Sequence, residues 1–201
     1  EHAEKSKKKL PLAIEQLKKM SFAATLKGEE NSPEDAEELL RSIVDTTINI
    51  LEAERATIFM ISEDGTKLVA TQLANYEDME RLNPATQKLR IVVDRNIGIC
   101  GHVASTRQLF NIHDVYDDPR FDRSVDMRTG YRTKSMLVCP ILSAKGEPLG
   151  VLQVMNKRIS YENENGEKKE GGPSLTDEDI SKPIFTEDDE QLIEMLSQHA
   201  S

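Results

Sequence analysis

The sequence predicts an α+β domain in which a helix is followed by about six antiparallel strands and then by a second helix. Three observations lead to this fold class. Apolar residues recur at helical spacing over residues 33–54 and again after residue 186. Between these segments, short β-branched and aliphatic runs alternate with turn residues, as is typical of strands joined by tight turns. The same pattern predicts one layer of helices over the sheet.

The N-terminal part of the chain is expected to be helical. An amphipathic pattern over residues 8–27 is interrupted by a glycine and polar residues, so residues 1–31 are interpreted as a helical extension or linker. Ser32 and Pro33 then form a strong helix start, with Ser at the N-cap and Pro at the first helical position. The apolar stripe of this helix is expected to run to about residue 54.

Strands are predicted in the middle of the chain. A Glu-Asp-Gly turn joins two strands into a hairpin over residues 56–73, and an Ala-Lys-Gly-Glu turn joins two more over residues 135–156. Shorter strands are expected at residues 89–93 and 109–112, on either side of a brief helix at residues 99–107.

The domain itself is placed at residues 32–201 and includes one stretch of different composition. Residues 158–184 are rich in Glu, Lys, Asn, Gly and Pro, so they are interpreted as a mobile insertion loop on the surface. Thr186 then begins the last helix with a capping box, and an apolar face follows it.

Composition excludes several classes of protein. Lys and Arg number 26 and Asp and Glu 36, and the resulting net charge of −10 argues against general binding of nucleic acids, which requires basic surface. Cys100 and Cys139 form neither a metal-ligand pattern nor a disulfide framework, so a reducing, cytoplasmic setting is expected. No apolar run approaches the roughly 20 residues of a bilayer span. Without an initiator Met, the sequence is interpreted as a fragment of a longer protein.

The stretch from residue 94 to residue 133 carries the most informative motifs. Gly98 and Gly101 flank a predicted helix start, whose free N–H groups can hold one phosphate. Further motifs follow in order: Asn-Ile-His-Asp-Val-Tyr from residue 111, Asp-Pro-Arg-Phe from residue 118, Asp-Met-Arg-Thr-Gly-Tyr-Arg-Thr from residue 126 and Leu-Val-Cys-Pro-Ile from residue 137. Together they resemble the cyclic-nucleotide-binding GAF domains of cyclic-nucleotide phosphodiesterases and cyanobacterial adenylyl cyclases.

The resemblance runs from about Ala36 to the end and implies the GAF fold, a sheet of about six antiparallel strands flanked by N- and C-terminal helices. A spaced family signature supports it, formed here by Asn156, Lys157, Phe185, Asp189 and Glu190. In the family this set fixes the last strand to the last helix through a Lys–Asp ion pair, away from the ligand. Here that pair has to close across the long insertion.

The resemblance also implies a set of ligand-binding positions. They are Thr57, Leu73, Ile99, Cys100, Asp122, Asp126, Thr129, Thr133 and Gln153. In family members the helix start at residues 99–100 gives amides to the phosphate, the two threonines of the Thr-Gly motif line the phosphate and ribose, and the acid at position 126 lies on the covering segment. The positions of Thr57 and Gln153 face the base. Leu73 and Asp122 stand where some members carry an aromatic residue and a tyrosine.

The identity of the base is left open by these residues. Gln153 carries an amide donor and an acceptor together, so it can pair with adenine or with guanine. Ala74 stands where some family members have an acid that would bind the N–H groups of guanine, and its presence slightly favours cAMP over cGMP. No cofactor or metal is expected besides this ligand.

The resemblance implies a regulatory function rather than catalysis by this chain. The cyclic nucleotide would close residues 117–130 over the phosphate and control a linked effector, with a cyclic-nucleotide phosphodiesterase as the preferred parent and an adenylyl cyclase as the second. A homodimer through the terminal helices is expected, although these helices can equally serve only to cover the sheet. Two alternatives are a GAF dimerisation scaffold that binds no nucleotide and an enzyme that reduces free methionine sulfoxide through its cysteines.

Overall fold

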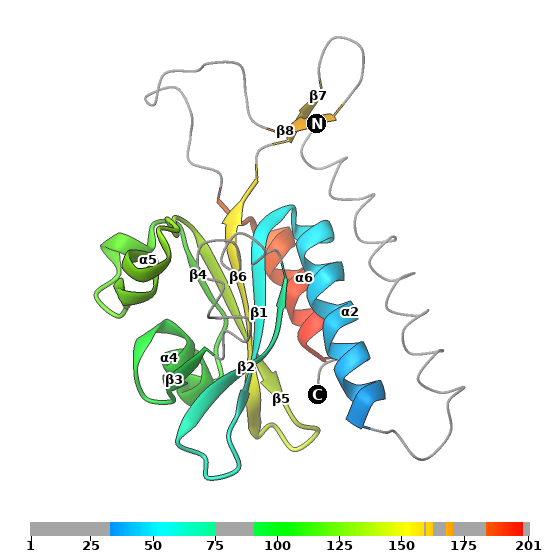
Figure 1. Cartoon of the computed structure of the whole chain (residues 1–201). Helices are drawn as coiled ribbons and strands as arrows, with labels where there is room; N and C mark the ends of the chain where they lie inside the picture. The colour runs from blue at the N-terminus through cyan, green and yellow to red at the C-terminus, as the bar shows by residue number, and fades with distance from the viewer. Residues whose placement is uncertain (1–32, 75–90, 159, 163–167, 171–183, 199–201) are drawn as a thin grey trace.

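The computed structural model describes residues 33–74, 91–158, 160–162, 168–170 and 184–198, and its centre is a six-stranded antiparallel sheet (Figure 1). The strand order is β3-β2-β1-β6-β5-β4. The strands of this sheet are β1 (Ala53–Ile61), β2 (Lys67–Ala74), β3 (Val92–Asp94), β4 (Phe110–Ile112), β5 (Met136–Leu142) and β6 (Pro148–Lys157). The helices are α2 (Pro33–Leu51), α4 (Gly98–Thr106), α5 (Ser124–Thr129), α6 (Glu187–Gln198) and the 3-10 turn η2 (Val115–Asp117). The predicted α+β class is confirmed.

One face of the sheet is covered by the two long helices, α2 and α6, which lie side by side (Figure 1). Both helices are amphipathic, and their apolar stripes face the sheet because burial of those side chains removes them from water. Ile43, Leu51, Ile193 and Leu196 have no exposed surface and pack in one cluster with Leu152 of β6.

The opposite face carries α4, and the segment with η2 and α5 lies on the same side (Figure 1). Ile99, Val103 and Ala104 of α4 are buried in a second apolar cluster, which includes Val138 and Val151 of the sheet. The prediction of a single helical layer is therefore wrong. The short helix buries its apolar residues even though its nine residues are too few to show a clear helical period in the sequence.

The end of α2 also differs from the prediction. The helix stops at Leu51 rather than near residue 54, because Glu52 adopts a left-handed conformation with φ of 50° and Ala53 already begins β1. A glycine usually marks such a helix end, and a glutamate gives no signal of it.

The insertion after β6 contains a small two-stranded sheet of its own. Its strands are β7 (Ser160–Glu162) and β8 (Lys168–Glu170), which pair antiparallel. Residues 159, 163–167 and 171–183 of the predicted insertion loop lie outside the described residues, as do the predicted extension at residues 1–31 and the polar stretch at residues 75–90. Within the described part of the chain, no helix combines the length and the apolar character needed to cross a membrane.

Candidate functional site

Two buried polar residues lie opposite each other at the centre of the sheet. Thr57 of β1 pairs with Gln153 of β6, and both belong to the face that α4 covers, where Val138 and Val151 are apolar neighbours. Thr57 has no exposed surface and Gln153 only 9%. The amide nitrogen of Gln153 donates to the thioether sulfur of Met136 at 3.4 Å, which is a weak acceptor. The sheet thus brings together the two side chains expected to face a base.

The predicted position Leu73 belongs to the same region of the sheet through its backbone. Leu73 of β2 pairs with Thr57 of β1, and Thr57 pairs with Gln153 of β6, because β1 lies between β2 and β6 and is hydrogen-bonded to both. The three positions 73, 57 and 153 therefore form one row across three adjacent strands.

A buried carboxylate holds the segment after η2 closed. Asp126 of α5 is 6% exposed and accepts hydrogen bonds from Thr133 and Tyr116. One of its oxygens accepts from the backbone N–H of Thr133 at 2.8 Å and from the hydroxyl of Tyr116 at 3.1 Å, and the other accepts from the hydroxyl of Thr133 at 2.8 Å. The proton of the Thr133 hydroxyl is thus directed to Asp126, so in this conformation it is not available to a phosphate.

Two other predicted positions of this segment are placed differently. Asp122 is exposed, and its carboxylate accepts hydrogen bonds from the backbone N–H and the hydroxyl of Ser124, both at 2.9 Å, so it orders the start of α5. Thr129 is the last residue of α5, and only its backbone is described.

The start of α4 has the backbone that the predicted phosphate seat needs. Gly98 has a φ of 77°, a conformation that glycine adopts without strain, and the N-cap residue Ile97 makes no side-chain hydrogen bond to the helix start. Gly101 is required by close packing, because a Cβ atom there would lie 2.5 Å from the carbonyl oxygen of Arg95. Ile99 directs its side chain into the core and Cys100 is half-buried, so their possible contribution to a phosphate is through backbone amides.

Neither cysteine has the environment of a nucleophile. Burial raises the pKa of the Cys100 thiol to about 12 and that of Cys139 to about 11. Because the thiolate is the reactive form, both side chains are poor nucleophiles at neutral pH.

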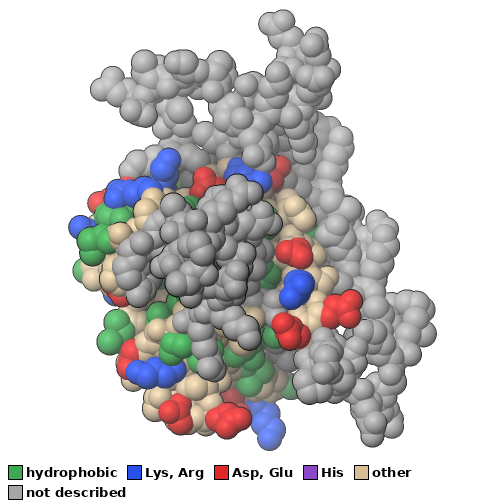
Figure 2. Space-filling model, in the orientation of Figure 1, with side chains coloured by type: hydrophobic (Ala, Val, Ile, Leu, Met, Phe, Trp, Pro, Cys, Tyr) green, Lys and Arg blue, Asp and Glu red, His purple; other side chains and the backbone are tan. Residues whose placement is uncertain are grey.

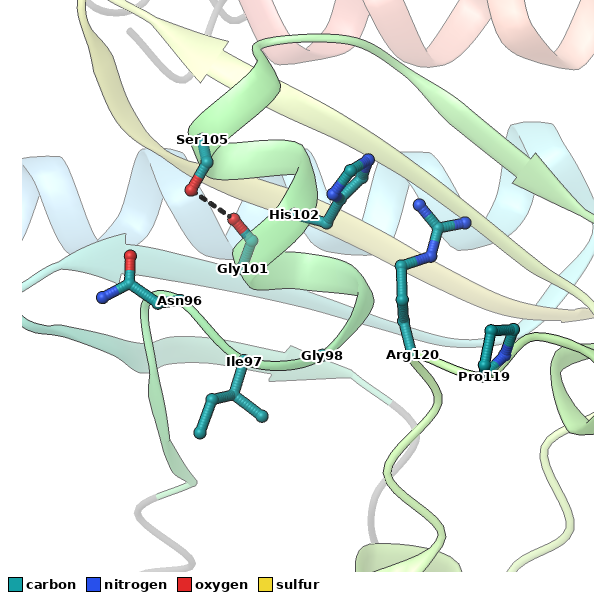
Figure 3. A pocket seen from close by; sticks show the side chains of 8 residues that line it. All are labelled: Asn96, Ile97, Gly98, Gly101, His102, Ser105, Pro119 and Arg120. Carbon is teal, nitrogen blue, oxygen red and sulfur yellow. Dashed lines mark hydrogen bonds between the residues drawn. The ribbon is translucent and has the colours of Figure 1, made fainter.

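A separate cavity of about 460 Å³ lies on the outer side of α4 (Figure 3). It is lined by Asn96, Ile97, Gly98, Gly101, His102, Ser105, Pro119 and Arg120. The guanidinium of Arg120 donates to both carboxylate oxygens of Asp118, at 2.9 and 2.5 Å, and this contact holds the pKa of Asp118 below its usual value. The cavity contains none of the predicted ligand positions, and its arginine is already neutralised.

The family signature forms contacts between the sheet and α6. The ammonium of Lys157 donates to both oxygens of Asp189 at 2.8 Å, with the two side chains only 12% and 4% exposed, so the expected ion pair is present. Asp189 also accepts from the backbone N–H of Thr186 at 2.9 Å. The ion pair therefore fixes the end of β6 to the start of α6.

Asn156 and Asn111 extend these contacts. Asn156, with a left-handed φ of 57°, accepts from the N–H of Lys134 at 2.7 Å and donates to Glu54 at 2.8 Å, which ties the segment after α5 to the sheet. Asn111 of β4 donates to the carbonyl of Phe185 and to the carboxylate of Glu190, at 2.9 and 2.8 Å. Sequence reasoning assigned no role to Asn111 or to Tyr116, although both belong to a motif that it singled out.

Comparisons with known proteins agree with this architecture. The model of the GAF domain family matches residues 35–201. The dual 3',5'-cyclic-AMP and -GMP phosphodiesterase 11A of Takifugu rubripes is 32% identical over 149 residues, which are 73% of this chain and 14% of the relative. The probable 3',5'-cyclic phosphodiesterase pde-5 of Caenorhabditis elegans is 38% identical over 111 residues, which are 54% of this chain and 15% of that protein. The chain thus spans about one seventh of the length of these relatives.

Solved structures are similar in fold. The GAF domain of a Coxiella burnetii phosphoenolpyruvate-protein phosphotransferase has a TM-score of 0.63 at 17% identity, covering 94% of this chain and 89% of that one. A free methionine-R-sulfoxide reductase from Neisseria meningitidis has a TM-score of 0.61 at 14% identity, covering 94% of this chain and 86% of the other. At such identities the likeness concerns the fold alone.

Proposed function

Because this chain belongs to the GAF domain family, we propose that it binds a cyclic nucleotide, with a slight preference for cAMP over cGMP, and regulates a linked cyclic-nucleotide phosphodiesterase. The two curated relatives, which are phosphodiesterases by name, support this parent. The role of the chain itself is regulatory, and no catalytic step is assigned to its residues. The cytoplasm is the compartment in which such a ligand and effector would meet.

The observation that carries the proposal is the environment of Gln153. A buried amide without a strong hydrogen-bond partner lowers the stability of the folded chain by about 1–3 kcal/mol. A ligand that supplies the missing hydrogen bonds would explain why a glutamine stands at this position. Among the described residues its amide nitrogen meets only a thioether, at 3.4 Å, and Thr57 is the residue opposite it on the next strand. The edge of a purine base would supply both a donor and an acceptor to this amide.

The covering segment would respond to the phosphate of the ligand. Amides at residues 99–100 would receive the phosphate at the start of α4. The hydroxyl of Thr133 would then have to turn from Asp126 toward the phosphate, since it has one proton to donate. Loss of that bond would change how residues 115–133 are held, and the Asn156 contacts and the Lys157–Asp189 pair connect this segment to α6.

Isothermal titration calorimetry of the nucleotide-stripped chain tests the proposal. We expect saturable binding of cAMP, and somewhat weaker binding of cGMP, that is weakened by Gln153→Leu and by Thr133→Ala. Lys145→Ala, in the exposed turn between β5 and β6, is the control and should bind as the unmodified chain does. Absence of heat with both nucleotides would contradict the proposal and favour a scaffold that binds no nucleotide.

Dimerisation through the terminal helices is part of the same proposal. The buried stripes of α2 and α6 already face the sheet, so a partner would contact apolar residues that are only partly buried there, namely Leu39, Leu40 and Met195. Analytical ultracentrifugation should show a dimer that Leu40→Glu converts to monomer. A monomer at all accessible concentrations would contradict this part of the proposal.

A further inference from the structure

Two arginines share one aromatic ring on the surface near α5. The guanidinium carbon of Arg132 lies 3.3 Å from the centroid of the Tyr116 ring, and that of Arg123 lies 4.8 Å from the same point. Because both distances are measured from one centroid, the two guanidinium carbons can be no more than about 8 Å apart. Both arginines are exposed, so their remaining N–H groups face solvent.

The arrangement is held in place from several sides. Arg123 donates to the carbonyl oxygen of Tyr116 at 2.9 Å, and the carbonyl of Arg132 accepts from Asn156 at 2.9 Å. The hydroxyl of Tyr116 is in turn bound to the buried carboxylate of Asp126. A planar guanidinium stacked on a ring loses little further freedom when it binds a ligand. The pair of arginines is therefore preorganised.

The charge at this place is unlike that of the whole chain. The net charge of the chain is −10, yet within the described residues neither Arg123 nor Arg132 forms a salt bridge with a carboxylate. The nearby carboxylate of Asp126 is buried and accepts hydrogen bonds from Tyr116 and Thr133. Figure 2 shows Lys and Arg side chains gathered on this side of the molecule, beside the position of α5.

From this geometry we propose that Arg123 and Arg132 form a binding site for one phosphoryl group of a phosphorylated peptide. Because their guanidinium carbons lie no more than about 8 Å apart, one phosphate placed between the two groups can accept hydrogen bonds from both. A phosphoserine carries close to two negative charges at neutral pH, which matches two arginines that form no salt bridge with any carboxylate of the described residues.

A phosphorylated peptide fits better than an extended polyanion. Asp117 and Asp122 are exposed on the same segment, and the chain as a whole is acidic, so a nucleic acid or an anionic membrane would be repelled around the two arginines. A single phosphoryl group needs only the local positive charge. The two arginines lie in the segment proposed to cover the nucleotide, but they are not among its proposed ligand positions, and they face solvent whereas Gln153 and Thr57 are buried in the sheet.

Fluorescence anisotropy with the full chain tests the site. The probe is a fluorescein-labelled peptide with one phosphoserine between glycine and alanine residues, and the same peptide without phosphate is its control. We expect binding that requires the phosphate and weakens about tenfold in Arg123→Gln and in Arg132→Gln, since each loses charged hydrogen bonds. Arg132→Lys should bind between these values because lysine keeps the charge but not the planar fork.

Matched variants separate this site from general charge effects and from the nucleotide pocket. Arg41→Gln removes the same charge from an exposed position on α2, and Gln153→Leu removes the proposed base contact; neither should change peptide binding. Circular dichroism of each variant shows whether it is folded. Equal binding of both peptides, an equal loss in Arg41→Gln, or tighter arginine-dependent binding of single-stranded RNA or phosphatidylserine vesicles would overturn the proposal.

Discussion

The two faces of the sheet are built from the same strands but differ in how their polar groups are satisfied. On the face covered by α2 and α6, the buried hydroxyls bond within their own helices, as Thr47 does to the carbonyl of Ile43 and Ser197 to that of Glu194. On the face covered by α4, polar side chains bond across segments, as Asp126 does with Tyr116 and Thr133. Polar contacts that join the sheet to α6, namely the Lys157–Asp189 pair and the bond from Asn111 to Glu190, lie at the start of that helix.

This difference indicates a division of tasks between the two faces. The apolar core between the sheet and helices α2 and α6 stabilises the fold. The polar side chains on the face of α4 are hydrogen-bonded to neighbouring segments, and these bonds can be exchanged for bonds to a ligand. The alternation of strand residues assigns each neighbour to one face or the other, so Leu152 faces the helices and Gln153 faces α4. Substitutions at adjacent positions can therefore test the division directly.

The largest effect is expected at the ion pair that joins the end of β6 to the start of α6. Lys157→Ala should lower the free energy of unfolding by about 3–5 kcal/mol, because it leaves the buried carboxylate of Asp189 without its cation. Urea denaturation measures the change. Arg41→Ala breaks an exposed pair with Glu37 and should cost less than about 1 kcal/mol. Equal losses of unfolding free energy in the two variants would show that the Lys157–Asp189 pair does not stabilise the attachment of α6 to the sheet.

A core truncation on the α2–α6 face should come next. Leu152→Ala should cost about 2–5 kcal/mol in urea denaturation, because Leu152 has no exposed surface and the cavity would lie between two helices and the sheet. A loss below 1 kcal/mol would mean that the apolar core of this face does not stabilise the fold.

The neighbouring position on the other face should behave in the opposite way. Gln153→Leu should leave the free energy of unfolding within about 1 kcal/mol of its original value, or raise it, because the one acceptor of its amide nitrogen in the described part of the chain is a thioether. The same variant should lose the proposed nucleotide binding. A destabilisation as large as that of Leu152→Ala would identify Gln153 as a structural residue and remove the contrast.

The smallest effect concerns pH. Arg120 holds the pKa of Asp118 below 3.8, so the carboxylate is more acidic in the folded than in the unfolded chain. Its contribution to stability is therefore present above about pH 4 and is lost as the pH falls through the lowered pKa. Asp118→Asn should cost less than about 1 kcal/mol at pH 7, since Arg120 is partly exposed, and the two unfolding free energies should converge toward pH 2. A constant difference across this range would contradict the assignment.

Much of the sheet was predictable because its signals are local. The hairpin of β1 and β2 follows from two alternating runs around a Glu-Asp-Gly turn, and β5 and β6 from a similar pair. The beginning of α2 agrees with the Ser-Pro start, but its end does not, because the left-handed conformation at Glu52 has no sequence signal. The brief helix at residues 99–107 was predicted, but its nine residues show no clear period, so the sequence did not indicate that α4 covers the opposite face of the sheet.

The candidate site was predictable in its residue types more than in its contacts. The resemblance pointed to Asp126 and Thr133, but not to the hydrogen bond between them. These residues are seven positions apart in a segment without helical or strand periodicity, so the sequence pattern does not predict their contact. The bond between Asn111 and Glu190 joins positions 79 residues apart, and such a contact depends on the complete fold. Phosphate and base contacts at Cys100 and Gln153 stay predictions.

The pairing of β1 with β6 has a consequence for how quickly the chain can fold. These two strands are adjacent in the centre of the sheet, yet Arg55 lies opposite Met155, so about a hundred residues of chain separate the partners. Closing so long a loop costs entropy before any packing is gained, and domains dominated by such distant pairings fold in milliseconds to seconds rather than microseconds. The two hairpins can form early as independent units, and the rate-limiting event is then expected to be their meeting along β1 and β6.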